Sequence, residues 1–154
     1  MDKTVVFLTG FGPFEGHETN ASWEAVKLVP TLNTEEELSI KLFVEQLPVV
    51  YSSIEKLVPE LKLAYKPDVT IHVGVYNGRG IRIEEFAKKK GYTKNDIIDN
   101  CPKGGICSTG SDDVLCTQIN LPLLSRTFFN ETKQPIYISK EAGKYVLLLR
   151  TLCP

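Results

Sequence analysis

The chain of 154 residues has a formal net charge of −1, 42% hydrophobic residues and 24% charged residues, values that are ordinary for one globular domain. A net charge this close to zero disfavours nucleic acid and membrane surfaces as partners, and every apolar run is shorter than the roughly 20 residues that a membrane-spanning helix needs. The opening sequence, MDKTVVFLTGF, differs from a signal peptide because an acid stands at position 2 and the apolar run stops at Gly10. We therefore expect a cytoplasmic protein whose four cysteines are mostly reduced.

Segments with strand and helix periodicity alternate along the chain. The predicted strands span residues 4–9, 39–45, 69–75, 81–86 and 135–139. The predicted helices span residues 23–29, with Ser22 as N-cap, 53–65 and 112–126, and a further helical pattern begins at Ala142. Residues 88–113 are rich in glycine and charge and are expected to form a loop. The alternation predicts an α/β fold with a mostly parallel sheet that helices cover on both faces.

Two glycine-containing segments follow predicted strands: LTGFGPFEG at residues 8–16 and HVGVYNGRG at residues 72–80. Parallel sheets bind ligands at the carboxyl ends of their strands, so a site is expected at these segments. The first has the spacing G-x-G-x-x-x-G, and Pro13 removes a backbone donor from it, which disfavours a nucleotide-phosphate loop. Its two phenylalanines, Phe11 and Phe14, either pack into the core as part of an ordinary turn or line a ligand site.

The cysteines and histidines disfavour a metal site. Cys101 and Cys107 are spaced too widely for a C-x-x-C motif, and no second cysteine pair or histidine cluster accompanies them. His72 lies inside a predicted strand and is expected to be a packing residue. We therefore expect no metal and no other cofactor.

The order of residues in TGFGPFEGHETNASWEAV, at positions 9–26, resembles the N-terminal signature of the pyroglutamyl-peptidase type I family, T-G-F-x-P-F-G followed by N-x-S-W-x-A-V. The family consists of cytosolic cysteine peptidases that remove an N-terminal pyroglutamyl residue from peptides. Further segments that match the family are QLPVVY at 46–51, HVGV at 72–75, KKKGY at 88–92, IDN at 98–100, DNCP at 99–102 and ISKEAGKYV at 138–146. Of these, KKKGY and DNCP are most similar to the animal branch of the family.

The resemblance implies one family domain at residues 1–146 and a tail at residues 147–154 that does not match the family. The implied fold is a three-layer α/β/α arrangement around an open, twisted, mostly parallel sheet, from which the last strand and helix of the family are missing. The implied partners are peptides with an N-terminal pyroglutamate, and neither nucleic acid nor membrane.

The resemblance also implies the residues that hold the substrate. Phe11 and Phe14 correspond to the two phenylalanines that sandwich the lactam ring of pyroglutamate. Asn20 and Val75 correspond to residues that help to hold the same ligand. An apolar slot with a few polar groups suits this ring, because the ring is small, flat and uncharged.

The chemistry that the resemblance implies is thiol acyl transfer, in which a histidine moves the proton and a carboxylate orients the histidine. The family carboxylate corresponds to Glu84 when the segments are aligned on Ala87, and to Glu85 when residues are counted without a gap from Gly74. We prefer Glu84, with Glu85 as the alternative, since adjacent residues of a strand point to opposite faces and only one acid can face the site. Without the resemblance, both acids are expected to be solvated charges at a strand edge.

The chain departs from the family at the nucleophile. Leu147 stands where the family has its cysteine, the family histidine is absent, and neither His17 nor His72 matches it. Cys153 lies six residues past that position and has no matching histidine. We therefore expect this chain to be inactive as written; the alternatives are a peptidase whose sequence is incomplete here, a non-catalytic pyroglutamyl-binding chain, or an unstable truncated isoform or paralogue.

Overall fold

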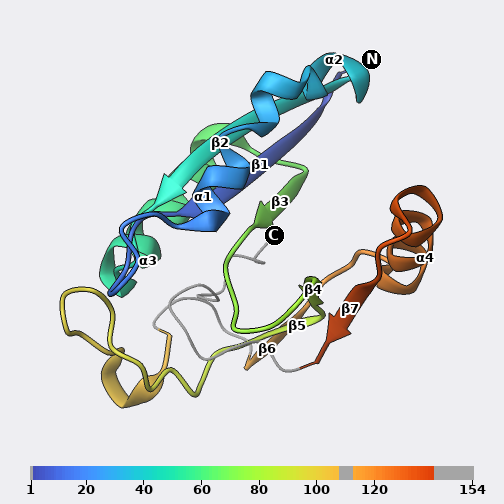
Figure 1. Ribbon diagram of the computed structural model, residues 1–154. Helices are drawn as coiled ribbons and strands as arrows, with labels where there is room; N and C mark the ends of the chain where they lie inside the picture. The colour runs from blue at the N-terminus through green and yellow to red at the C-terminus, as the bar shows by residue number, and fades with distance from the viewer. Residues whose placement is uncertain (1, 108–112, 141–154) are drawn as a thin grey trace.

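The computed structural model describes residues 2–107 and 113–140 (Figure 1). The strands are β1 (Thr4–Phe11), β2 (Ile40–Leu47), β3 (Val69–His72), β4 (Ile81–Glu84), β5 (Phe86–Lys88), β6 (Val114–Cys116) and β7 (Ile136–Ser139). The helices are α1 (Ala21–Val26), α2 (Thr34–Glu37), α3 (Tyr51–Tyr65) and α4 (Leu121–Thr132), with short 3₁₀ turns at Val29–Leu32 and Lys103–Gly105.

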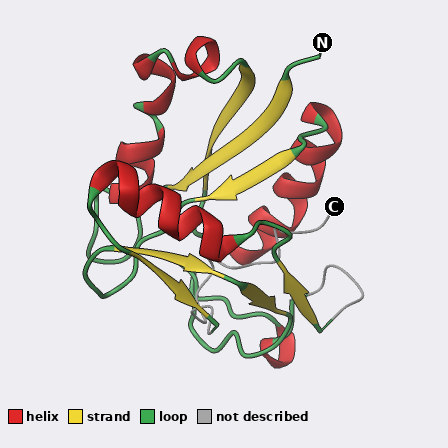
Figure 2. Cartoon of the chain, turned by 90° about the vertical axis from the view of Figure 1, so that its right-hand side faces the viewer, coloured by secondary structure: helices red, strands yellow, loops and turns green. Residues whose placement is uncertain are grey.

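A three-stranded parallel sheet with the order β2-β1-β3 forms the centre of the fold. Alternate residues of β1 face opposite sides of this sheet. Phe7 faces α3, where its ring meets the edge of Tyr65 at 5.6 Å between centroids. Gly10 faces α1, which packs directly on β1. Helices therefore cover both faces of the sheet (Figure 2), and the predicted three-layer α/β/α arrangement is confirmed.

The remaining strands form two smaller sheets. β4 pairs with β7 in parallel, with Glu84 opposite Ser139, and β5 pairs with β6 in an antiparallel ladder. α4 packs beside β7 (Figure 1). The α/β class and the mostly parallel pairing are confirmed, but the described strands are divided among three sheets instead of one open sheet. The division arises after β3, because β4 takes β7 as its partner and not a strand of the central sheet.

The predicted helix at residues 112–126 is wrong at its start. Val114–Cys116 form β6, which pairs with Phe86–Lys88, and this cross-strand pairing overrides the local helical pattern. The helix begins at Leu121, after Asn120 caps it by accepting a hydrogen bond from the Leu123 amide at 3.0 Å. It then continues to Thr132.

The boundaries of other elements also differ from the prediction. The predicted strand at residues 81–86 is interrupted at Glu85, so β4 ends at Glu84 and β5 begins at Phe86. Asn20, not Ser22, is the N-cap of α1, because its side chain accepts from the Ser22 amide. β3 ends at His72 and not at Val75, although the Val73 amide still donates to the Thr9 carbonyl at 2.9 Å.

The main core cluster lies where the ends of β1 and β2 meet α3. Its buried members are Phe11, Leu47, Tyr51, Ile54, Val58, Tyr92 and Cys107. Tyr92 and Cys107 come from the segment that was predicted to be a loop. That segment is thus packed against α3 and closes the core at this end of the sheet.

Candidate functional site

The loop after β1 is fixed to the start of α1 by a buried polar cluster. Asn20 and Ser22 are only 4% and 2% exposed. The Asn20 Oδ1 atom accepts from the Ser22 amide at 3.0 Å and from the Ser22 hydroxyl at 2.8 Å, and Asn20 Nδ2 donates to the Gly12 carbonyl at 2.9 Å. The Ser22 hydroxyl oxygen in turn accepts from the Phe11 amide at 3.0 Å. The four interactions hold the backbone of residues 11 and 12 in one position relative to α1.

Replacing Asn20 with alanine is expected to lower the free energy of unfolding by about 2 kcal/mol, because it removes a helix cap and leaves buried polar groups without partners. Asn130→Ala is the matched control, since Asn130 is exposed on α4, and its expected effect is below about 0.5 kcal/mol. Urea unfolding followed by circular dichroism measures both. Equal midpoints for the two variants would show that the cluster does not stabilise the loop.

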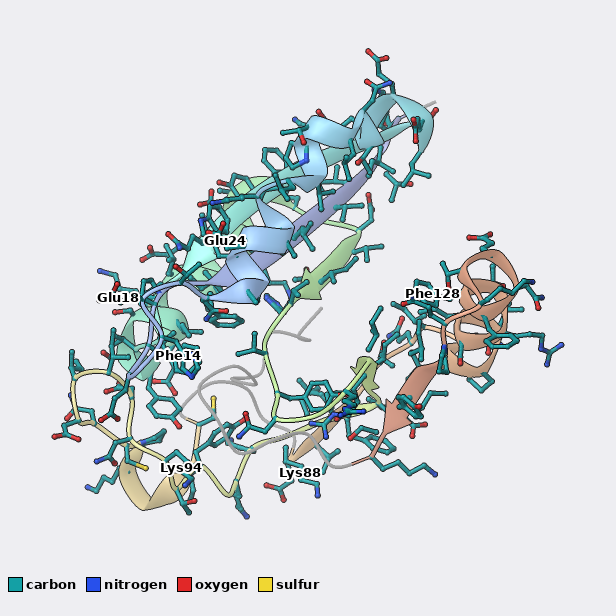
Figure 3. The ribbon with its side chains drawn as sticks, viewed as in Figure 1. Phe14, Glu18, Glu24, Lys88, Lys94 and Phe128 are labelled. Carbon is teal, nitrogen blue, oxygen red and sulfur yellow. The ribbon has the colours of Figure 1, made fainter. Side chains whose placement is uncertain are left out.

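The two phenylalanines of this loop have different surroundings. Phe11 is 2% exposed and belongs to the core cluster beside Leu47, Tyr51 and Ile54. Phe14 is half-buried and lies on the loop at the carboxyl end of β1, close to the α3 end of the molecule (Figure 3). Phe11 therefore has the packing role that the sequence left open, and Phe14 is the ring that a ligand can reach more readily. Their joint role as a sandwich stays a prediction.

Phe14 is paired with His17 across a tight turn. The Phe14 amide donates to the His17 carbonyl at 3.2 Å, and the His17 amide donates to the Phe14 carbonyl at 2.8 Å. Gly16, between them, has a φ of +74°, a conformation that glycine adopts without steric cost. The two rings are 4.4 Å apart between centroids, with planes inclined by 31°. Sequence reasoning missed this contact, although the Gly16 turn signal between two ring-bearing residues could have indicated it.

The segment after β3 reaches the same end of the central sheet. His72 Nδ1 lies 2.6 Å from the hydroxyl of Thr9, a fully buried residue of β1, and the Phe7 ring meets the imidazole edge-on at 6.1 Å. His72 is thus a packing residue, as expected. Val75 is half-buried three residues further along, and its predicted contact with a ligand is not tested by these contacts.

Glu84 lies at the end of β4 in an ion pair. Its Oε1 atom is 2.7 Å from Nη2 of Arg82, and the Glu84 side chain is only 18% exposed. The Arg82 guanidinium in turn lies 4.6 Å from the centre of the Tyr76 ring. The two residues are two apart on one strand and therefore share a face, a signal that sequence reasoning could have used. Glu84 is consequently not a solvated edge charge.

Glu85 connects the two smaller sheets through its backbone. Its amide donates to the Ser139 carbonyl at 2.8 Å, and its carbonyl accepts from the Thr117 amide at 3.0 Å. Glu84 and Glu85 each have a buried Oε2 atom without a hydrogen-bond partner among the described residues. Buried carboxylate oxygens normally have partners, so either acid can accept a further donor. The choice of Glu84 over Glu85 as the family carboxylate stays a prediction.

Leu147 and Cys153 lie outside the described residues. In the part of the chain that the structure describes, no group of three or more histidine, cysteine, aspartate or glutamate side chains is arranged to hold a metal ion. Within residues 2–107 and 113–140, no helix combines the length and the apolar composition that crossing a membrane requires.

Comparisons with known proteins give one consistent result. The family described as pyroglutamyl peptidase matches residues 4–148. The chain is 30% identical over 146 residues to pyroglutamyl-peptidase 1 of Homo sapiens, an alignment that covers 94% of this chain and 69% of that protein. It is 33% identical over 143 residues to pyrrolidone-carboxylate peptidase of Thermococcus onnurineus, which covers 92% of this chain and 69% of that protein.

The fold is likewise similar to solved structures. The crystal structure of pyroglutamyl peptidase I from Bacillus amyloliquefaciens superimposes with a TM-score of 0.80 and 32% identity, over 94% of this chain and 69% of that one. A pyrrolidone carboxyl peptidase mutant from Pyrococcus furiosus superimposes with a TM-score of 0.78 and 25% identity, over 95% and 71% of the two chains.

Proposed function

Because this chain belongs to the pyroglutamyl peptidase family, we propose that the loop after β1 binds the N-terminal pyroglutamyl residue of peptides and that the chain as written does not cleave them. The observation that carries the binding proposal is the buried Asn20–Ser22 cluster, which holds the loop rigidly while Phe14 stays accessible. A preorganised loop loses little freedom on binding, so more of the contact energy becomes affinity.

The four residues of the proposed site have different roles toward the ligand. Phe14 offers an aromatic face to the flat lactam, Phe11 lies deeper, and Val75 follows the neighbouring strand β3. Asn20 acts mainly by holding the Gly12 carbonyl and Ser22, because both its Oδ1 interactions and one of its Nδ2 hydrogens are already engaged. The site thus selects for a small, uncharged ring.

The absence of cleavage is proposed from the residue at the nucleophile position. Leu147 carries no group that can attack a carbonyl carbon. The proposed acid, Glu84, has one carboxylate oxygen paired with Arg82 at 2.7 Å and the other without a hydrogen-bond partner among the described residues, so the proposal rests on the missing nucleophile and not on the acid. A peptidase of this type needs a thiolate and a histidine oriented by the acid.

We expect no release of a chromogenic amine from a pyroglutamyl amide by the chain of 154 residues, at neutral pH with reductant present, above the rate in buffer. The Cys153→Ala variant should behave identically, because Cys153 lies six residues past the family nucleophile position and has no matching histidine in the sequence. Turnover that survives Cys153→Ala and disappears in Glu84→Gln would show that the chain holds a working nucleophile elsewhere and would overturn the proposal.

We expect pyroglutamate amides to bind with a micromolar to millimolar Kd, since a ligand with so few heavy atoms can contribute only about 0.5–1 kcal/mol per atom. Two-dimensional NMR titration measures this range. Phe14→Ala should abolish the shifts, whereas Phe129→Ala should leave them unchanged, because Phe129 is a 49% exposed phenylalanine on α4. Equal titrations of both variants would remove Phe14 from the site.

A further inference from the structure

Phe14 and His17 form a ring pair, and backbone hydrogen bonds and the turn between them fix the positions of both residues. The reciprocal amide–carbonyl hydrogen bonds of 3.2 and 2.8 Å make the two residues a directly opposed pair across a turn. Pro13 restricts the backbone before Phe14, and Gly16 supplies the positive φ that closes the turn. The two side chains are therefore held on the same side of the turn, with centroids 4.4 Å apart.

His17 packs its ring against one face of the Phe14 ring. Phe11, the other ring of the proposed slot, is 2% exposed and lies in the core, whereas His17 is exposed and Phe14 is half-buried between these extremes. A ligand held between Phe14 and Phe11 would have to use the face of Phe14 that His17 leaves open, because the imidazole packs against the other face. Loss of His17 would remove the contact that orients the Phe14 ring and shields one of its faces from water.

We propose that His17 is a positioning residue of the pyroglutamyl site, which holds the Phe14 ring in the orientation that receives the lactam. This inference rests on the proposed function, because it assigns His17 to the same slot. Its role is independent of proton transfer, since the ring acts through stacking and not through a charge. Any flat aromatic side chain at position 17 should therefore hold the Phe14 ring, and imidazole is not specifically required.

NMR titration of pyroglutamate amide into His17 variants tests this inference. An aromatic pair of this kind predicts that His17→Ala weakens binding about 3- to 10-fold. His17→Phe should bind as the unchanged protein does, and His17→Leu, which has bulk without a flat ring, should bind as weakly as His17→Ala. Glu18→Ala is the matched control on the same exposed loop (Figure 3) and should leave the Kd unchanged.

Rescue by phenylalanine and not by leucine separates ring stacking from a general loss of loop structure. If the unchanged protein binds and His17→Ala binds equally well, the positioning role is wrong and the proposed function stands. If His17→Leu binds as tightly as His17→Phe, the aromatic requirement is wrong. If the unchanged protein gives no titration at all, the proposed function and this inference are both wrong.

Discussion

Gly10→Ala is expected to lower the free energy of unfolding by about 3 kcal/mol. A β-carbon at this position would lie 2.7 Å from the Cα of Trp23, 2.9 Å from the Ser22 carbonyl oxygen and 2.9 Å from the Trp23 nitrogen. These are backbone atoms of α1, so they cannot move aside as a flexible side chain would. Relief requires α1 to shift away from β1, which strains the hydrogen bond that the Phe11 amide donates to the Ser22 hydroxyl and the one that this hydroxyl donates to Asn20.

Gly12→Ala is the matched control, because Gly12 lies two residues further along, in the loop after β1. The β-carbon at Gly12 would meet its nearest neighbour, the Leu47 carbonyl oxygen, at 3.6 Å, which is ordinary van der Waals distance, so its effect should be small. Thermal unfolding by circular dichroism should place the Gly10→Ala midpoint roughly 6–12 °C below that of Gly12→Ala. Midpoints within a degree or two of one another would show that α1 does not press on β1 as described.

Asp96→Ala is expected to lower the free energy of unfolding by about 3 kcal/mol. The reason is that Asp96 joins the start of α3 to a segment 45 residues later in the chain. Its Oδ2 atom accepts from the Tyr51 amide at 3.0 Å, and Oδ1 accepts from the amides of Ile98 and Asn100 at 3.0 and 2.9 Å. The side chain is 7% exposed. Because the valine at the N-cap of α3, Val50, has no side-chain acceptor, Asp96 supplies the cap from outside the helix.

The Tyr51 side chain reinforces the same junction. Its hydroxyl donates to the Lys94 carbonyl at 2.9 Å. Burial, with smaller contributions from Cys101 and Asp96, raises the pKa of Tyr51 to about 12, so this donor keeps its proton at physiological pH. Loss of Asp96 is therefore expected to loosen the junction without abolishing it.

Hydrogen exchange measured by NMR gives the sharpest test of Asp96. The amides of Tyr51, Ile98 and Asn100 should exchange faster in Asp96→Ala than in the unchanged protein, in addition to the lower midpoint in urea. Asp113→Ala is the control, since Asp113 is 74% exposed in an ion pair with Lys90 at 3.5 Å, and such pairs contribute about 0–1 kcal/mol. A midpoint for Asp96→Ala as high as that of Asp113→Ala would contradict the capping role.

The elements with strong local patterns could be predicted from the sequence. β1, β2 and α3 lie close to their predicted ranges, and the alternation of strands and helices is sufficient for the α/β class. The signature at residues 9–26 is sufficient for the family, which the family match over residues 4–148 confirms. These features can be predicted because apolar periodicity and an ordered motif depend only on residues that are close together in the sequence.

The candidate site could be predicted only in part. The motif predicts that the loop and Asn20 belong to the site, but it does not reveal that Phe11 is buried in the core or that His17 packs against Phe14. The alignment predicts Glu84 as the family carboxylate, whereas its pairing with Arg82 depends on both side chains meeting on one face of β4.

The sequence by itself determined the types of β1, β2, α1 and α3, the fold class and the family motif. The tertiary structure decided which backbone amides and carbonyls form hydrogen bonds with distant segments of the chain. Residues 114–116 became a strand because β5 offers a ladder there, and the segment after β5 became part of the core because Asp96 and Tyr92 attach it to α3. Local propensity contributes tenths of a kcal/mol per residue, whereas burying a strand edge or a helix end without partners costs several times more, so long-range pairing prevails where the two disagree.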